Sequence, residues 1–252
     1  DQDYKTVLSI TERFLRLIED NLIVTSSLSF SRSTKSNIQD KSYYNFKARI
    51  ESAGNFLSLL SKGLNLAEEE SYAGNTKLFG IEYAQYIKTE VDFVKQWDFG
   101  KKNVLALHSF AGIAIPYGNA NTIPFLRSYF AGGSNDNRGW QPYSLGPGRS
   151  GGFFDFNEAN FKLSFSTEYR FRVSGNFHSA IFVDVGNIWN FLDYTEDFED
   201  KESVFEGIKS LQDIAVGSGI GLRYDFDFFV FRIDLGYKTY NPAREMGDRW
   251  FK

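Results

Sequence analysis

The stretch FKLSFSTEYRFRV, residues 161–173, alternates apolar and polar side chains with a period of two. Its apolar positions carry aromatic and aliphatic groups, and its polar positions carry lysine, serine, glutamate and arginine. Because successive side chains of a strand point to opposite faces, the stretch predicts a β-strand with one apolar and one polar face. Charges in the middle of the polar face indicate that this face is in contact with water.

The same alternation recurs on both sides of this strand. The other alternating stretches are 22–30, 44–50, 79–93, 105–115, 181–185, 216–226 and 229–237, which makes eight predicted strands in all. Residues 4–19 instead place apolar side chains at helical spacing. We therefore expect a short helical or loop segment at 1–20, followed by a β-sheet domain at 21–252.

The predicted connections between the strands are unequal in length. The short turns are 100–103, 174–177 and 225–228, and the long polar segments are 62–76, 118–159 and 190–212. If residues 32–42 count as a turn, the short and long connections fall at opposite ends of the sheet. Bacterial outer-membrane barrels show this asymmetry, with short turns at one end and long loops at the other.

Composition narrows the class of protein. Aromatic residues make up 17% of the chain, yet the mean hydropathy is -0.34. No run of about eighteen apolar residues is present, which excludes a helical span, whereas barrel strands give little hydropathy signal. The net charge of -4 disfavours nucleic acid as a partner. The absence of cysteine removes disulfides and thiolate metal sites.

A soluble β-sandwich also alternates apolar and polar residues, so the period alone does not separate the two folds. Three features favour a barrel: charges in mid-strand, strands that follow one another without Greek-key jumps, and aromatic residues near strand ends, such as Trp97, Trp189 and Phe228. We therefore predict an all-β, antiparallel, up-and-down transmembrane β-barrel.

The longest predicted connection, 118–159, contains RSYFAGGSNDNRGW, residues 127–140. This stretch resembles the loop signature of the Omp85 superfamily, which has an aromatic residue before a Gly-Gly-Ser-Asn run and then Arg-Gly followed by an aromatic residue. The residues that carry the resemblance are Gly132, Gly133, Ser134, Asn135, Arg138, Gly139 and Trp140. The resemblance implies that this loop folds into the barrel lumen and that its Arg-Gly tip docks on the inner wall.

Two strand motifs extend the resemblance in the family's order. Glu168 matches an acidic position of the strand after the loop, and FVDVGNIW, residues 182–189, matches a Phe-x-Asp-x-Gly-Asn strand. The hairpin at 219–237 resembles the family's penultimate strands. Barrels of this family have about sixteen strands. We therefore expect the C-terminal half of a larger barrel, with a final strand and soluble periplasmic repeats outside this sequence.

The residues themselves point to a loop lock. Glu168 and Asp184 share the inward parity, and a turn centred near Asn176 would place them about opposite one another. Two such carboxylates repel unless a cation lies between them, and the planar fork of Arg138 suits that position. Alternatively, Arg138 is an ordinary surface residue and the carboxylates pair with Arg170 or Arg172.

Glycines recur in the loop and on one predicted strand. We expect Gly132, Gly133 and Gly139 to adopt positive φ and reverse the chain. On the inward face of the strand, glycine would make room for the loop or for Arg232 and Asp234 of the next strand, or else mark a kink. These strand glycines are Gly217, Gly219 and Gly221.

No motif in the sequence indicates an enzyme. A G-x-G-x-x-G match at 146–151 contains a proline and opens no helix, so it is not a dinucleotide site. His108 and His178 are far apart and have no accompanying candidate metal ligands. Neither a G-x-S-x-G nor an H-E-x-x-H motif is present. We expect no catalysis, no cofactor and no metal.

The resemblance implies a protein of the bacterial outer membrane that inserts or translocates other proteins. Its expected partners are outer-membrane lipid, client outer-membrane or secreted proteins, and periplasmic proteins or lipoproteins. Two alternatives remain open. One is a passive channel whose selectivity is set by inward charges, and the other is a barrel that anchors a lipase-like enzyme. The inward charges are Lys162, Arg170, Arg172, Arg223 and Arg232.

Overall fold

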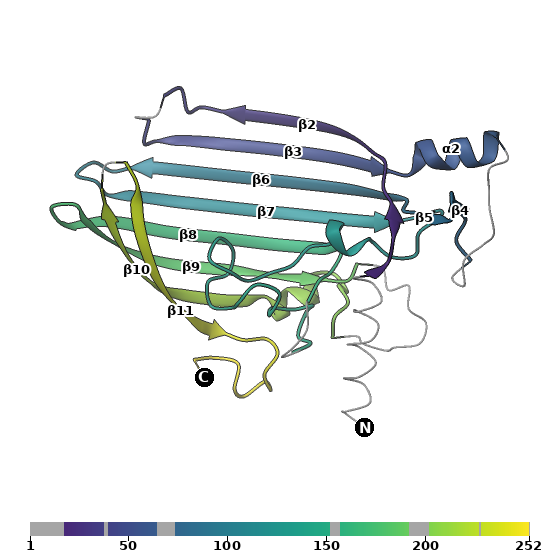
Figure 1. The fold of residues 1–252 in the computed structure, drawn as a ribbon. Coiled ribbons are helices and arrows are strands. Elements are labelled where there is room, and N and C mark those ends of the chain that lie inside the picture. Colours follow the sequence, from purple (N-terminus) through teal and green to yellow (C-terminus); the bar gives the residue numbers. More distant parts are fainter. Residues whose placement is uncertain are drawn as a thin grey trace.

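The chain folds into one curved, eight-stranded antiparallel sheet in the order β11-β10-β9-β8-β7-β6-β3-β2 (Figure 1). The computed structural model describes residues 18–37, 40–64, 74–151, 157–191, 202–226 and 228–251. The strands are β2 (Thr25–Ser33), β3 (Tyr43–Ala53), β6 (Tyr86–Asp98), β7 (Val104–Pro116), β8 (Phe161–Ser174), β9 (Phe177–Trp189), β10 (Ala215–Asp225) and β11 (Val230–Tyr240). Each pairs with the strand before it along the meander, which confirms the predicted antiparallel up-and-down sheet.

Smaller elements gather at the long-connection end of the sheet. They are β1 (Asn21–Leu22), α2 (Asn55–Gly63), β4 (Lys77–Leu78), β5 (Ile81–Tyr83) and two short 3-10 helices, η1 (Phe125–Arg127) and η2 (Ile208–Asp213). Strand β5 pairs with β4 and, in parallel, with β1 to form a separate three-stranded sheet. None of the helices in the described residues is long and apolar enough to cross a membrane.

The predicted continuous strand at 79–93 is wrong in its first part. Phe79 and Gly80 have φ values of 54° and 77°, so they form a two-residue turn between β4 and β5. The long strand begins only at Tyr86. Helix α2 was not predicted from the sequence pattern. The helix predicted over residues 4–19 lies almost wholly outside the described residues.

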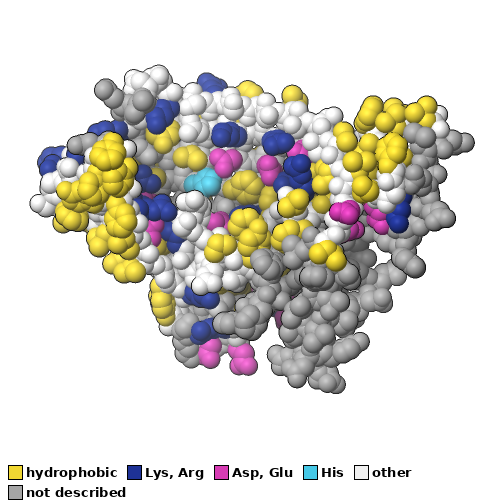
Figure 2. Space-filling view, viewed as in Figure 1, with side chains coloured by type: hydrophobic (Ala, Val, Ile, Leu, Met, Phe, Trp, Pro, Cys, Tyr) yellow, Lys and Arg dark blue, Asp and Glu magenta, His cyan; other side chains and the backbone are white. Residues whose placement is uncertain are grey.

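The two faces of the sheet differ in polarity. Large apolar side chains such as Leu28, Ile181 and Leu235 are exposed on the convex face, as in a lipid-facing wall. On the opposite, concave face, Figure 2 shows Lys and Arg side chains interspersed with Asp and Glu. Trp189 departs from the predicted aromatic belt: it is fully buried against Phe161 and Phe205, and so cannot lie at a membrane interface.

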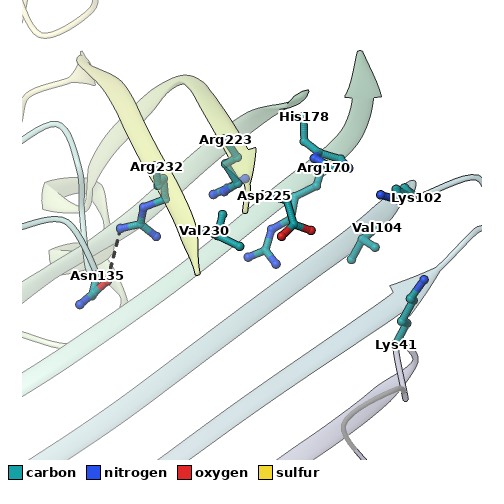
Figure 3. Close-up of a pocket in the computed structure, with 10 residues that line it drawn as sticks. All are labelled: Lys41, Lys102, Val104, Asn135, Arg170, His178, Arg223, Asp225, Val230 and Arg232. Carbon is teal, nitrogen blue, oxygen red and sulfur yellow. Dashed lines mark hydrogen bonds between the residues drawn. The ribbon is translucent and has the colours of Figure 1, made fainter. Parts of the chain in front are cut away.

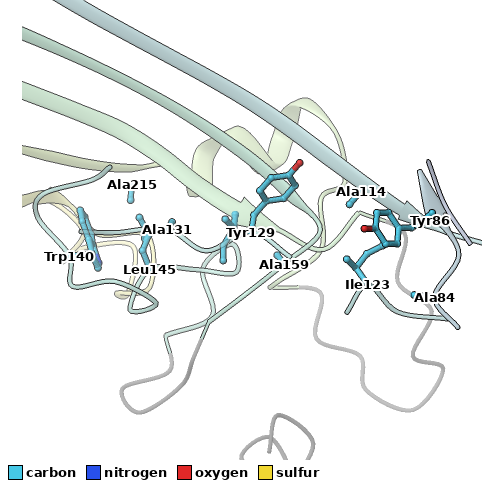
Figure 4. Close-up of a cluster of buried hydrophobic side chains, with 12 residues drawn as sticks. Ala84, Tyr86, Ala114, Ile123, Tyr129, Ala131, Trp140, Leu145, Ala159 and Ala215 are labelled. Atoms are coloured by element: carbon cyan, nitrogen blue, oxygen red, sulfur yellow. The ribbon is translucent and has the colours of Figure 1, made fainter. Parts of the chain in front are cut away.

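The core lies on the concave side, between the wall and the long loop that crosses it (Figure 4). The loop contributes Tyr129, Ala131, Trp140 and Leu145, among others, and the strands contribute Tyr86, Ala114, Ile188 and Ala215. On β7, a Cβ at Gly112 would lie 2.5 Å from the hydroxyl oxygen of Tyr129, so glycine is needed for this approach. The loop is thus packed on the wall along much of its length.

At the edges of the described sheet, β2 and β11 each pair with only one neighbouring strand. The free edge of β11 is partly covered near its end, because Trp250 forms an antiparallel bridge with Tyr240. The backbone N–H of Phe251 also donates to the carbonyl of Thr239, 3.0 Å away. Among the described residues, no other strand pairs with β2 or β11.

Candidate functional site: a buried arginine at the loop tip

Arg138 lies at the tip of the long loop, with its side chain 8% exposed, and contacts carboxylates from three strands. Its Nη1 is 2.6 Å from Glu168 on β8. Its Nε and Nη2 each donate to Asp184 on β9 at 2.8 Å, in a two-pronged contact, and its backbone N–H donates to the same carboxylate at 3.0 Å. Asp234 on β11 is more distant, at 3.4 Å. The guanidinium therefore joins the loop to three strands.

The two predicted carboxylates are not directly opposite one another. Glu168 pairs with Phe182, and Asp184 pairs with Ser166, so the carboxylates are diagonal neighbours on the inward face. The expected register differs from the observed one by two residues. One residue comes from the turn, which is centred between Gly175 and Asn176, and the other comes from a bulge near Arg172. The shift also brings Phe182 under the arginine, with the guanidinium carbon 3.4 Å from the ring centre.

Other arginines share the same carboxylates. Arg170 Nε and Arg223 Nη2 lie 2.5 Å and 2.7 Å from Glu168, and Arg232 Nε lies 3.2 Å from Asp234. The alternative pairing of Glu168 with Arg170 is therefore present together with the Arg138 contact. Arg172 donates instead to the carbonyl of Gly175.

Electrostatics keep Arg138 charged. Burial tends to lower the pKa of its guanidinium, but the hydrogen bonds to Asp184 and Glu168 outweigh this effect and raise the pKa above its ordinary value. Arginine is already protonated throughout the physiological range. The contacts with the carboxylates consequently persist at any pH at which the carboxylates are ionised.

The loop motif builds a compact turn around the arginine. Gly132 and Gly133 have φ values of 95° and 108°, as predicted, and the N–H of Gly133 donates to the carbonyl of Trp140 at 2.9 Å. The N–H of Gly132 donates to Asp136, which also pairs with Lys162 at 3.0 Å. Ser134 and Asn135 face β11, where the carbonyl of Ser134 accepts from Arg232 at 3.1 Å.

Gly139 does not have the positive φ that we predicted. It is needed for close approach instead, because a Cβ there would lie 3.1 Å from the carbonyl oxygen of Tyr237 and 3.4 Å from the Cα of Gly217. Trp140 follows in the core at 5% exposure, with the Lys238 ammonium 5.3 Å from the centre of its ring. The Arg-Gly tip is therefore fitted closely to the last two strands.

The strand glycines serve different neighbours. A Cβ at Gly217 would collide with the side chain of Asn137 in the loop, and one at Gly221 would collide with Asp234. Gly219 leaves space for Phe182. Gly236 on β11 was not singled out from the sequence, yet its missing side chain admits the carbonyl of Arg138. The strand glycines therefore make room both for the loop and for a charged neighbour, at different positions.

Sequence reasoning also missed a buried amide that joins the loop to the wall. Asn187 is fully buried, and its Nδ2 donates at 2.6 Å to the carbonyls of both Gly148 and Asp213. It thereby fixes the returning part of the long loop and the connection after β9. The residue belongs to the 182–189 motif, so the motif marked its position without indicating its role.

A family model described as the Omp85 superfamily domain matches residues 14–251. The chain belongs to the Omp85 superfamily. A search of curated proteins found no match. Omp85 members are outer-membrane proteins of Gram-negative bacteria or organelles, and are generally transporters or assembly factors without enzymatic activity.

Proposed function

We propose that this chain forms part of an outer-membrane barrel that inserts or translocates other proteins, and that Arg138 locks the lumen loop to the wall. The proposal includes a bacterial outer-membrane location and assigns residues 21–252 to the barrel segment, with the lumen loop at 118–159. The observation that carries it is the buried contact of one loop arginine with Glu168, Asp184 and Asp234 in an Omp85 chain.

The lock is expected to be strong because its charges are buried. Removal of one partner from a buried ion pair costs about 3–5 kcal/mol, since the other partner loses its compensation. Arg138 binds acids on β8, β9 and β11, so the loop braces these strands against one another. In this role Arg138, Glu168 and Asp184 hold a conformation and form no covalent bonds with a client.

The clients in this proposal are outer-membrane or secreted proteins. A barrel strand with an open edge can hydrogen-bond an incoming client strand by β-augmentation. The apolar convex face would contact outer-membrane lipid, and periplasmic proteins or lipoproteins would bind outside the bilayer. Because the loop braces β8–β11, we expect any change of barrel shape during insertion to occur in the other strands.

A double-mutant cycle tests the lock. Arg138→Ala, Asp184→Ala and the double variant would be compared by the temperature at which the folded gel band converts to the unfolded one. We expect strong non-additivity, with the double variant little worse than either single variant. The same pattern is expected for Arg138→Ala with Glu168→Ala. Simply additive effects would mean that the loop is not held by these contacts in the membrane.

A second experiment tests the activity itself. Liposomes with and without the full-length protein would receive a urea-unfolded small outer-membrane barrel, and its folding would be followed by gel mobility. We expect faster folding with the protein present and slower folding with the Arg138→Ala variant. Equal rates in both kinds of liposome would exclude an insertion role for this probe.

Conductance separates the proposal from a passive channel. The loop core occupies the concave side of the sheet, which favours a closed lumen. We therefore expect low conductance in planar bilayers and a large increase when residues 127–150 are deleted. High conductance by the unaltered protein would favour the channel, with Arg170, Arg223 and Arg232 setting its selectivity for anions.

A further inference from the structure

A charged cavity of about 610 Å³ lies on the concave side near the short turns, apart from the loop core (Figure 3). Its cations come from five parts of the chain: the β2–β3 connection, the β6–β7 turn, β8, β10 and β11. They are Lys41, Lys102, Arg170, Arg223 and Arg232. Asp225 is the one carboxylate among the described residues that line the cavity. Figure 3 shows these side chains spread around one space, on separate parts of the chain.

The cavity keeps excess positive charge even after its neighbours are counted. The lining cations and Arg138 make six positive groups, and the carboxylates of Asp225 and the Arg138 cluster make four negative ones. The difference is two positive charges. A concave surface of one sign concentrates its field and attracts ions of the opposite sign.

Arg223 is a buried cation in the lining of this cavity. Its side chain is only 9% exposed, and its Nη1 has no hydrogen-bond partner among the described residues. Its Nη2 forms an ion pair with Glu168 at 2.7 Å. A buried donor without an acceptor is costly, so a small movement of the Arg223 guanidinium toward an oxyanion in the cavity would remove this cost.

Lys102 is held beside the cavity by a strained turn. Lys101 and Lys102 have φ values of 50° and 64°, which side chains with a Cβ seldom adopt. The turn is closed by the N–H of Asn103, which donates to the carbonyl of Gly100 at 2.9 Å. Such strain is often retained where it positions a functional group.

We propose that this cavity binds a small soluble molecule that carries phosphate groups. A phosphate offers more oxygens and more charge than one carboxylate, so it can bridge guanidinium and ammonium groups from several strands. The volume falls within the range of about 300–1,000 Å³ that is usual for small-ligand sites. The cavity opens on the polar side of the sheet, away from the apolar face, which favours a soluble ligand over a lipid. The site does not depend on the proposed role in protein insertion.

Calorimetric titration of the detergent-solubilised full chain tests this site, with pyrophosphate as the probe and citrate as a carboxylate comparator. We expect saturable binding of pyrophosphate and clearly weaker binding of citrate. Lys102→Gln should weaken pyrophosphate binding about tenfold, as expected for a lost charge-assisted hydrogen bond. Lys101→Gln is the matched control, because it removes the same charge from the same turn but not from the cavity lining.

Three results would each overturn the proposal. They are an absence of saturable pyrophosphate binding, equal weakening by the two lysine substitutions, and citrate binding as tight as that of pyrophosphate. The last result would assign the cavity to carboxylates. Unchanged gel mobility of both variants before and after heating would show that the substitutions have not altered the fold. Client folding can be measured in the same preparations, so failure of this site is distinguishable from failure of the insertion role.

Discussion

The guanidinium carbon of Arg138 lies 3.4 Å from the centre of the Phe182 ring, while its nitrogens reach Glu168 and Asp184. The residue is thus held by an aromatic face and by carboxylates together. Both kinds of contact come from the inward faces of β8 and β9. The ring also shields the ion pairs from water, which strengthens them.

Phe182→Leu should loosen the loop while keeping an apolar side chain of similar reach. Loss of a desolvated cation–π contact costs about 1–2 kcal/mol. Trypsin cleavage after Arg138 measures the undocked population, and its rate should rise roughly 5- to 30-fold. Phe165→Leu, on the convex face, is the control and should leave the rate unchanged. Equal rates for the two variants would mean that the ring contributes only apolar volume.

Gly236→Ala should displace the loop tip. A Cβ there would collide with the carbonyl of Arg138, and overpacking of this kind costs about 1–3 kcal/mol. We expect faster tryptic cleavage and a lower unfolding temperature. Gly247→Ala is the matched control, because no atom lies within 4 Å of the added carbon. An unaffected Gly236→Ala variant would show that the tip does not approach β11 this closely.

The docking free energy lost when an acidic partner of Arg138 is replaced should follow the number and length of that partner's contacts. Asp184 accepts from Nε, Nη2 and the backbone N–H of Arg138, whereas Asp234 accepts from one nitrogen at 3.4 Å. Asp184→Asn should therefore cost about 3–5 kcal/mol of loop docking, and Asp234→Asn clearly less. Urea titrations followed by tryptic protection would give this order. The reverse order would place the main contact on β11.

Docking should be insensitive to alkaline pH. A group with a raised pKa in the folded state contributes stability that is complete below its unfolded pKa and is lost only as pH passes the folded value. For Arg138 both values lie above the range of a protease assay, so protection should be equal from about pH 7 to about pH 10. Arg138→Lys should begin to lose protection only as the pH rises beyond about 10.4, the ordinary pKa of lysine. Parallel loss in the unaltered protein would mean that another group controls docking.

The strands were predictable because the two faces of the sheet differ so much in polarity. Residues 161–173 alternate without interruption, and the observed strand is Phe161–Ser174. The break before β6 was hidden because Ile81 and Tyr83 continue the same alternation through a different sheet. Helix α2 is only nine residues long, and its pattern is too brief to stand out from a loop.

For the site, residue parity and motif order placed Arg138, Glu168 and Asp184 on the same inner surface. The register required knowledge of the bulge near Arg172, which depends on local backbone geometry that no side-chain pattern records. Phe182 was read only as a member of a motif, because an aromatic residue on a polar face gives no indication of its partner. Gly236 was missed for a similar reason: its importance comes from the chain that passes over it.

The contact between Arg138 and Asp234 joins positions 96 residues apart in the chain. Contacts of such long range form late in folding, because the intervening chain must first be ordered. The loop tip therefore cannot reach its full set of acidic neighbours until the β10–β11 hairpin has been added to the wall. The full set of Arg138 contacts would then form only after β8 to β11 have been assembled in the correct order.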